Sequence, residues 1–188
     1  MLKKIKLSRI LFIGFLLLLI IPQTRQQIQI LLHKGLALFS PSAISEEDRV
    51  VLDNYKWNLV DESGEVFDFS SAKGKVVVIN FWATWCPPCI AEMGSLDKLY
   101  QHYGKNANVV LLYITSDDVK TTQEFKGKKG YNFKVYREQS SAPELLQTRA
   151  IPRTLIISKD GKVVVDKTGA ANWNSDTVKN EIESLLKQ

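Results

Sequence analysis

Residues 76–90 read Val-Val-Val-Ile-Asn-Phe-Trp-Ala-Thr-Trp-Cys-Pro-Pro-Cys-Ile, and this stretch decides how the chain folds. Residues 76–83 are almost all apolar, so they predict a strand that is buried on both faces of a sheet. From Pro88 onward, apolar side chains recur at helical spacing until Gly104, which is placed to end a helix. Cys86 and Cys89, the chain's two cysteines, lie at the junction of strand and helix.

A Cys-x-x-Cys pair indicates either half of a zinc site or a redox dithiol. A tetrahedral zinc site needs about four ligands, and the chain adds only His33 and His102 to the two cysteines. A purely structural disulfide would close a very short loop and remove little chain entropy. The redox interpretation fits better, because a cysteine at a helix N-terminus is stabilised as the attacking thiolate. Cys86 is therefore expected to attack, and Cys89 to resolve the mixed disulfide.

Outward from this segment, hydrophobic patterning predicts an alternation of strands and helices. The expected order is a β-hairpin (55–60 with 65–69), a strand (76–83), a helix (88–104), a strand (108–115), a helix (117–130), a strand (133–136), a short helix (142–149), a β-hairpin (153–158 with 162–166) and a last helix capped by Asn174 or Ser175. Such alternation predicts an α/β fold with a mostly parallel sheet, to which the closing hairpin adds antiparallel strands. Trp57, Trp82 and Trp173 are expected in the core.

The N-terminal 40 residues hold the chain's excess of positive charge. They contain six Lys or Arg and no acidic residue, which leaves 25 − 6 = 19 basic against 20 acidic residues in the rest of the chain. The remainder therefore has no charge signature for nucleic acid binding. Four of the cations precede the apolar run 10–21, which ends at Pro22. With no small-x-small cleavage site after it, residues 1–22 are predicted to be an uncleaved signal-anchor that keeps the N-terminus inside and exports the rest.

A second apolar segment, residues 28–39, is too short and too polar to span a bilayer. Two interpretations stay open: a helix that lies on the membrane surface, or a helix packed on the folded domain. Residues 23–50 are assigned to this membrane-proximal segment and its linker, and residues 51–188 to the folded domain.

The stretch from Val78 to Met93, read as Val-Ile-Asn-Phe-Trp-Ala-Thr-Trp-Cys-Pro-Pro-Cys-Ile-Ala-Glu-Met, resembles the active-site segment of the thioredoxin superfamily. It is most similar to the membrane-anchored TlpA/ResA-type thiol–disulfide oxidoreductases. Ala-Ile-Pro-Arg-Thr-Leu-Ile-Ile, residues 150–157, resembles the second signature of that family, a strand opened by a cis-proline. The resemblance covers about residues 50–188. It implies a thioredoxin-like fold, with a central mixed sheet flanked by helices and an extra N-terminal β-hairpin.

The resemblance also implies the site residues. Pro152 would be cis and packed beside the cysteines, where the Ile151 backbone could pair with an extended substrate. Trp85, Pro87 and Pro88 are further candidates for substrate contact, although Trp85 could also be partly buried bulk. No metal or cofactor besides the redox-active Cys86–Cys89 disulfide is implied.

Two positions in this segment bear on proton transfer. Many thioredoxins have a buried Asp where this chain has Asn80, whereas TlpA/ResA-type proteins have a Glu at the position of Glu92. Glu92 lies three residues after Cys89 on one helix face, so its carboxyl could point at Cys89 and accept the proton of that thiol. The alternative is a solvated first-turn Glu stabilised by the helix dipole.

The residues between the cysteines bear on the direction of electron flow. Neither Pro87 nor Pro88 has an N–H to donate to the Cys86 sulfur, so we expect a moderately lowered pKa and a fairly reducing pair. The family implies disulfide-containing protein substrates, apocytochrome c for example, and a membrane electron donor of the DsbD/CcdA kind.

Two other classes of function compete with this one. A peroxiredoxin-like peroxidase usually carries a Pro-x-x-x-Thr-x-x-Cys context, which the residues before Cys86 lack. A non-enzymatic module could use the dithiol to bind a metal ion. Peroxide consumption and anaerobic metal titration would distinguish these two from a disulfide reductase.

Overall fold

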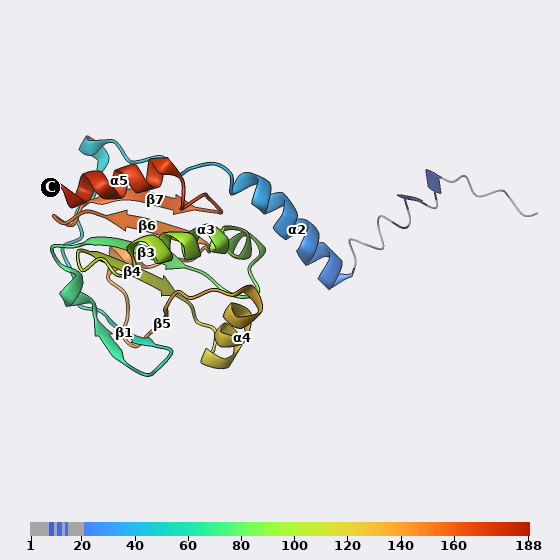
Figure 1. The fold of residues 1–188 in the computed structure, drawn as a ribbon, viewed down its shortest axis with the longest axis horizontal. Coiled ribbons are helices and arrows are strands. Elements are labelled where there is room, and N and C mark those ends of the chain that lie inside the picture. Colours follow the sequence, from blue (N-terminus) through green and yellow to red (C-terminus); the bar gives the residue numbers. More distant parts are fainter. Residues whose placement is uncertain (1–7, 10, 13, 15–20) are drawn as a thin grey trace, which may run out of the picture.

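In the computed structural model, which describes residues 8–9, 11–12, 14 and 21–188, a seven-stranded mixed sheet forms the centre of the protein (Figure 1). The strand order is β2-β1-β5-β4-β3-β6-β7. The strands are β1 (Asn58–Asp61), β2 (Val66–Asp68), β3 (Val76–Phe81), β4 (Val109–Ile114), β5 (Val135–Glu138), β6 (Arg153–Ile157) and β7 (Val163–Thr168). The α-helices are α2 (Pro22–Leu36), α3 (Pro87–Tyr103), α4 (Val119–Lys129) and α5 (Asp176–Leu186), and the 3-10 turns are η1 (Glu46–Asp48), η2 (Phe69–Ala72) and η3 (Glu144–Leu146).

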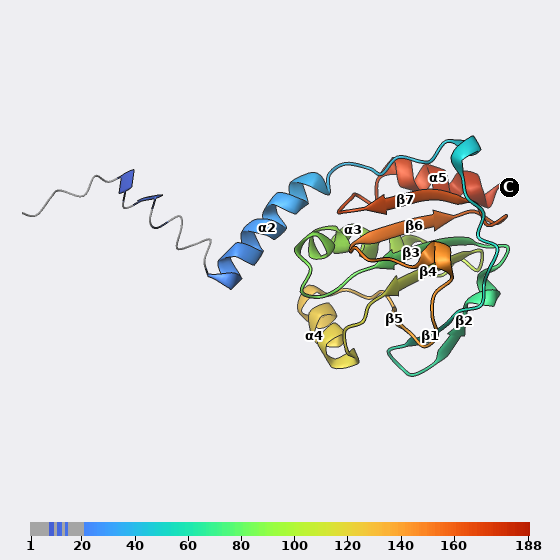
Figure 2. The same cartoon turned by 180° about the vertical axis from the view of Figure 1, so that it is seen from behind.

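Strand β3 is fully buried, as the apolar run predicts, because it lies between two hydrophobic cores. Val76 and Val78 point to one core, and Val77, Ile79 and Phe81 point to the other. This is the period of two of an extended strand. The first core lies under α3 and α5, which cover one face of the sheet (Figure 1). The second core lies on the opposite face, seen in Figure 2, where residues of η2 and η3 contribute to it.

The expectation of a mostly parallel sheet is wrong, and a mixed sheet is confirmed. Strand β3 is parallel to β4, and β4 is parallel to β5, but the other four strand pairs are antiparallel. The short helix expected at 142–149 is also reduced to the single turn η3. Arg153 explains the difference, because its guanidinium donates to the carbonyl oxygens of Leu145 and Gln147. Those carbonyls are then bound by a side chain and not by the N–H groups of a longer helix.

The expected anchor, residues 1–22, lies mostly outside the described residues. Among the residues that are described, no helix is both long and apolar enough to cross a bilayer. The next segment forms α2, which begins at Pro22, a residue suited to the first helical position. Helix α2 packs against α3, while its side chains Leu31 and Leu32 remain exposed.

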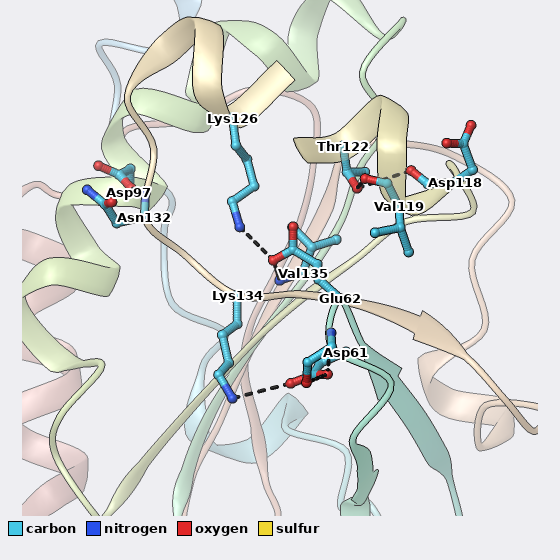
Figure 3. A network of polar contacts seen from close by, with 11 residues as sticks. Asp61, Glu62, Asp97, Asp118, Val119, Thr122, Lys126, Asn132, Lys134 and Val135 are labelled. Atoms are coloured by element: carbon cyan, nitrogen blue, oxygen red, sulfur yellow. Dashed lines mark hydrogen bonds and ion pairs between the residues drawn. The ribbon is translucent and has the colours of Figure 1, made fainter. Parts of the chain in front are cut away.

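The turn between β1 and β2 is fixed to the neighbouring part of the domain by carboxylates (Figure 3). Glu62 pairs with Lys126 of α4 at 2.6 Å and accepts the backbone N–H of Val135 at 3.3 Å. Asp61 accepts hydrogen bonds from the Ser63 and Glu65 backbone and pairs with Lys134 at 3.3 Å. The strand pair β1–β2 is therefore held at one edge of the sheet by polar contacts as well as by the ladder.

Substitution of Asp61 by Asn should destabilise the protein by about 1–3 kcal/mol at pH 7, because its hydrogen-bond donors lose the charged acceptor that the buried Asp61 carboxylate provides. Burial raises the pKa of Asp61, but hydrogen bonds from Ser63, Glu65 and Lys134 outweigh it and hold the pKa at about 2. This stabilisation is present above the unfolded-state pKa near 4 and is lost as the pH falls towards 2. Urea unfolding at pH 7, 4 and 3 measures both effects. Asp53→Asn, at an exposed position, is the matched control, and equal losses in the two variants would contradict the assignment.

Candidate active site

The two cysteines form a disulfide at the N-terminus of α3. Cys86 is the N-cap residue, and its sulfur accepts the Cys89 backbone N–H at 3.3 Å. Pro87 and Pro88 occupy the first two helical positions, where no intrahelical N–H donor is needed. Cys86 is 3% exposed and Cys89 is fully buried. Cys86 is thus the less buried residue of the two, which agrees with the order expected for attack and resolution.

The loop before Cys86 is held by the neighbouring strand connection. The Thr84 backbone N–H donates to the Asp117 carboxylate at 2.7 Å, and the Trp82 N–H donates to the Ile114 carbonyl at 3.0 Å. Asp117 follows β4, so parallel pairing of β3 and β4 brings its carboxylate to the cysteine loop. Sequence reasoning did not find this role for Asp117.

The segment before β6 lies directly beside the disulfide. The Ile151–Pro152 peptide is cis, and the Ile151 carbonyl oxygen is 3.8 Å from the Cys86 sulfur. Trp85 is 64% exposed next to this pair, whereas Trp57, Trp82 and Trp173 are buried, as expected. An exposed indole adjacent to a redox sulfur is available to contact a partner.

Glu92 is fully buried and is not the solvated residue of the alternative interpretation. Its Oε1 accepts from Asn80 Nδ2 at 2.9 Å, and its Oε2 accepts from the Trp173 indole at 2.8 Å and the Ala171 N–H at 3.1 Å. Burial raises the pKa of Glu92 to about 7, although the hydrogen bonds from Trp173, Ala171 and Asn80 each lower it. The carboxyl can therefore change its charge near neutral pH, one helical turn from Cys89.

Asn80 is the second polar group in this buried network. Its Nδ2 also donates to Thr154 Oγ1 at 2.7 Å, while its Oδ1 has no hydrogen-bond partner among the described residues. If Glu92 binds a proton, a flip of the Asn80 amide would present Oδ1 as the acceptor of the new O–H. Asn80 can thus pair with Glu92 in either protonation state. The comparison with thioredoxins, in which Asn80 only replaces a buried Asp, does not predict this role.

A short loop after β7 joins the parts of the site. The Gly169 N–H donates to the Pro152 carbonyl at 2.9 Å, and the next residues supply Ala171 and Trp173 to Glu92. Gly169 has a φ of 92°, a conformation that favours glycine. This loop connects the cis-proline with the buried carboxyl, a connection that hydrophobic patterning does not predict.

Two cavities flank Ile151. One, of about 530 Å³, is lined by residues that include Trp82, Ser116 and Arg137. The other, of about 410 Å³, lies between the cis-proline segment, Pro88 and residues of the α2 region. In the part of the chain that the structure describes, no group of three or more His, Cys, Asp or Glu side chains is arranged to hold a metal ion.

A disulfide at the start of a helix, beside a cis-proline segment on a mixed sheet, defines the class of thioredoxin-fold thiol–disulfide oxidoreductases. The Redoxin family profile matches residues 43–185. The chain belongs to this family and, within the thioredoxin superfamily, is of the ResA/TlpA type. Its redox group is the disulfide itself.

The relatives agree with this class. The chain is 30% identical over 112 residues to the thiol-disulfide oxidoreductase ResA of Halalkalibacterium halodurans, a match that covers 59% of this chain and 64% of that protein. It is 29% identical over 149 residues to the ResA of Bacillus cereus, covering 77% and 82%. Among solved structures, the chain is similar to a thioredoxin-family thiol:disulfide interchange protein from Chlorobium tepidum, with 21% sequence identity and a TM-score of 0.54. The match covers 80% of this chain and 98% of that protein, so the two share a fold.

Proposed function

We propose that the protein reduces disulfides in other proteins, outside the cytoplasm, from a membrane anchor in residues 1–22. The environment of the Cys86 sulfur supports this direction of electron flow. The sulfur accepts a hydrogen bond from the Cys89 N–H and lies 3.8 Å from the Ile151 carbonyl oxygen. A nearby carbonyl favours the protonated thiol, and the two prolines offer no N–H to a thiolate. A weakly stabilised thiolate gives a reducing pair.

The proposed reaction is a two-step exchange. The Cys86 thiolate attacks one sulfur of the substrate disulfide, that S–S bond breaks, and the other substrate sulfur leaves as a thiolate. Cys89 then gives its proton to Glu92 and attacks Cys86, which releases the second substrate thiol. The protein dithiol supplies both electrons and ends as the Cys86–Cys89 disulfide. A membrane electron donor of the DsbD/CcdA kind would restore the dithiol, and apocytochrome c is a candidate substrate.

The proposed location rests on the sequence and on helix α2. Cations precede the apolar run 10–21, and α2 follows it directly. Arg25 and Lys34 flank the exposed Leu31 and Leu32 on α2, a combination that suits a lipid surface. Helix α2 would then hold the dithiol close to the membrane in which an electron donor lies.

Equilibration of the purified protein with glutathione redox buffers tests the direction of electron flow. We expect a potential near that of thioredoxin, about −270 mV, and far from that of DsbA, about −120 mV. A value close to the DsbA potential would overturn the reducing function. Reduction of insulin or of a peptide disulfide, compared with consumption of peroxide, measures the activity itself.

A further inference from the structure

The cavity of about 410 Å³ beside the cis-proline has walls from two distant parts of the chain. Pro88, Ile151, Pro152 and residues 167–170 form one wall, and His33, Phe39 and Ser40 from the α2 region form the other. The second wall lies outside residues 43–185, which match the family. It is therefore a surface beyond the matched domain, next to the reactive disulfide.

The added wall is fixed to the domain by backbone contacts. The Asn172 N–H donates to the Phe39 carbonyl at 2.9 Å, and the Ile44 N–H donates to the Val164 carbonyl at 2.8 Å. Pro41, between them, is buried. Asn172 belongs to the same loop that supplies Ala171 and Trp173 to Glu92. The position of Phe39 is thus set by the loop that organises the site.

The lining has a definite chemistry. Four of the side chains around the cavity are large and apolar, namely Phe39, Pro88, Ile151 and Pro152, and Lys167 supplies a positive charge. Among the described residues, no Asp or Glu lines this cavity. Its volume falls within the range of about 300–1,000 Å³ that is typical of pockets that bind small ligands. The lining therefore favours an apolar side chain in the cavity. A residue next to that side chain would be neutral or acidic, because Lys167 is positively charged.

We propose that this cavity is a specificity pocket for the substrate, and that His33 of α2 with Phe39 and Ser40 after it supplies one wall. An extended substrate segment that lies along Ile151 would place the side chain next to its cysteine against Phe39 and His33. An acidic residue in that segment would face Lys167. The inference rests on the proposed function, because it requires a protein disulfide as the substrate.

Steady-state reduction of peptide disulfides by the full-length protein in detergent tests the pocket. One peptide carries Leu beside its cysteine with a flanking Glu, and a second replaces that Glu by Lys. For the first peptide, Phe39→Ala and His33→Ala should each raise KM about 5–10-fold and leave kcat within twofold. The Lys peptide should bind less well than the Glu peptide to the wild type, and Lys167→Ala should remove most of that preference.

The controls distinguish loss of the pocket from a general effect on the protein. Leu31→Ala alters an exposed side chain of α2 and should change nothing, and Arg137→Ala probes the other cavity. Hydroxyethyl disulfide, which is too small to need the pocket, should be reduced equally by all variants. An unchanged KM in Phe39→Ala, a larger effect in Arg137→Ala, or faster turnover without Phe39 would each overturn the pocket. Failure of the wild type to reduce even the small disulfide would instead refute the proposed function.

Discussion

Cells that produce the Cys89→Ala variant should accumulate covalent complexes between this protein and its substrates. Cys86 can still attack a substrate disulfide, but the buried thiol that would release the product is gone. Catalytic turnover should fall by at least about 10³-fold, because a thiol held in place has an effective molarity far above that of millimolar external thiols. Non-reducing electrophoresis followed by mass spectrometry measures both the complexes and their partners.

The Cys86→Ala variant is the matched control for this experiment. It should form no complexes, because Cys89 is fully buried and cannot meet a protein disulfide. Both variants lack the Cys86–Cys89 disulfide, so any general effect of its loss on stability appears in both. Equal trapping by the two variants would show that Cys89 is the attacking thiol and would reverse the assigned order.

The fold could be predicted largely from local pattern. The almost wholly apolar run at 76–81 predicts a strand buried on both faces, and the periodicity after Pro88 predicts an amphipathic helix; the structure has both. The last helix also begins where its cap predicts, with Ser175 accepting the Val178 N–H. These predictions are confirmed because each element is determined by residues within it or within a few positions of its ends.

The polar interior of the site could not be predicted in this way. Glu92 is bound by residues 12, 79 and 81 positions away along the chain. Such contacts depend on how strands and loops come together, and hydrophobic periodicity does not predict them. The wall contributed by Phe39 was missed for the same reason, since the 28–39 segment gave two equally good interpretations from its composition. The family resemblance pointed to Glu92, but its burial and its partners required the structure.

The Glu92→Gln variant should resolve the mixed disulfide about 10²-fold more slowly at pH 8 than the wild type, the lower end of the effect of general acid–base catalysis. The wild-type rate of resolution should rise with pH through about 7, because burial raises the pKa of Glu92 to that value and only the ionised carboxylate accepts the Cys89 proton. The variant should lack this rise. Stopped-flow tryptophan fluorescence across pH 5 to 9 follows the step, and Trp85 and Trp82 lie within four residues of Cys86 to report it.

The pH dependence of stability provides an independent measurement of the pKa of Glu92. The pKa of Glu92 is raised in the folded protein, so between about 4.5 and 7 the folded state binds more protons than the unfolded state. Its stabilisation is complete below the unfolded-state pKa and is lost as the pH rises through about 7. The free energy of unfolding of the wild type should therefore fall by roughly 3 kcal/mol between pH 5 and pH 8, relative to that of Glu92→Gln. In the variant, Asn80 can turn its unpartnered Oδ1 towards the new amide. Glu124→Gln, at an exposed position of α4, is the control for the loss of charge.

The two measurements together decide what Glu92 does. A slower and pH-independent resolution, with the stability of Glu92→Gln unchanged or higher at pH 8, would assign the carboxyl to proton transfer, because the fold would be intact while one step failed. If resolution and stability fell together at every pH, the carboxyl would serve mainly to bind Trp173 and Ala171 and hold the loop beside Pro152. Unchanged kinetics across the pH range would remove Glu92 from the reaction, and the proton of Cys89 would then have to leave by another route.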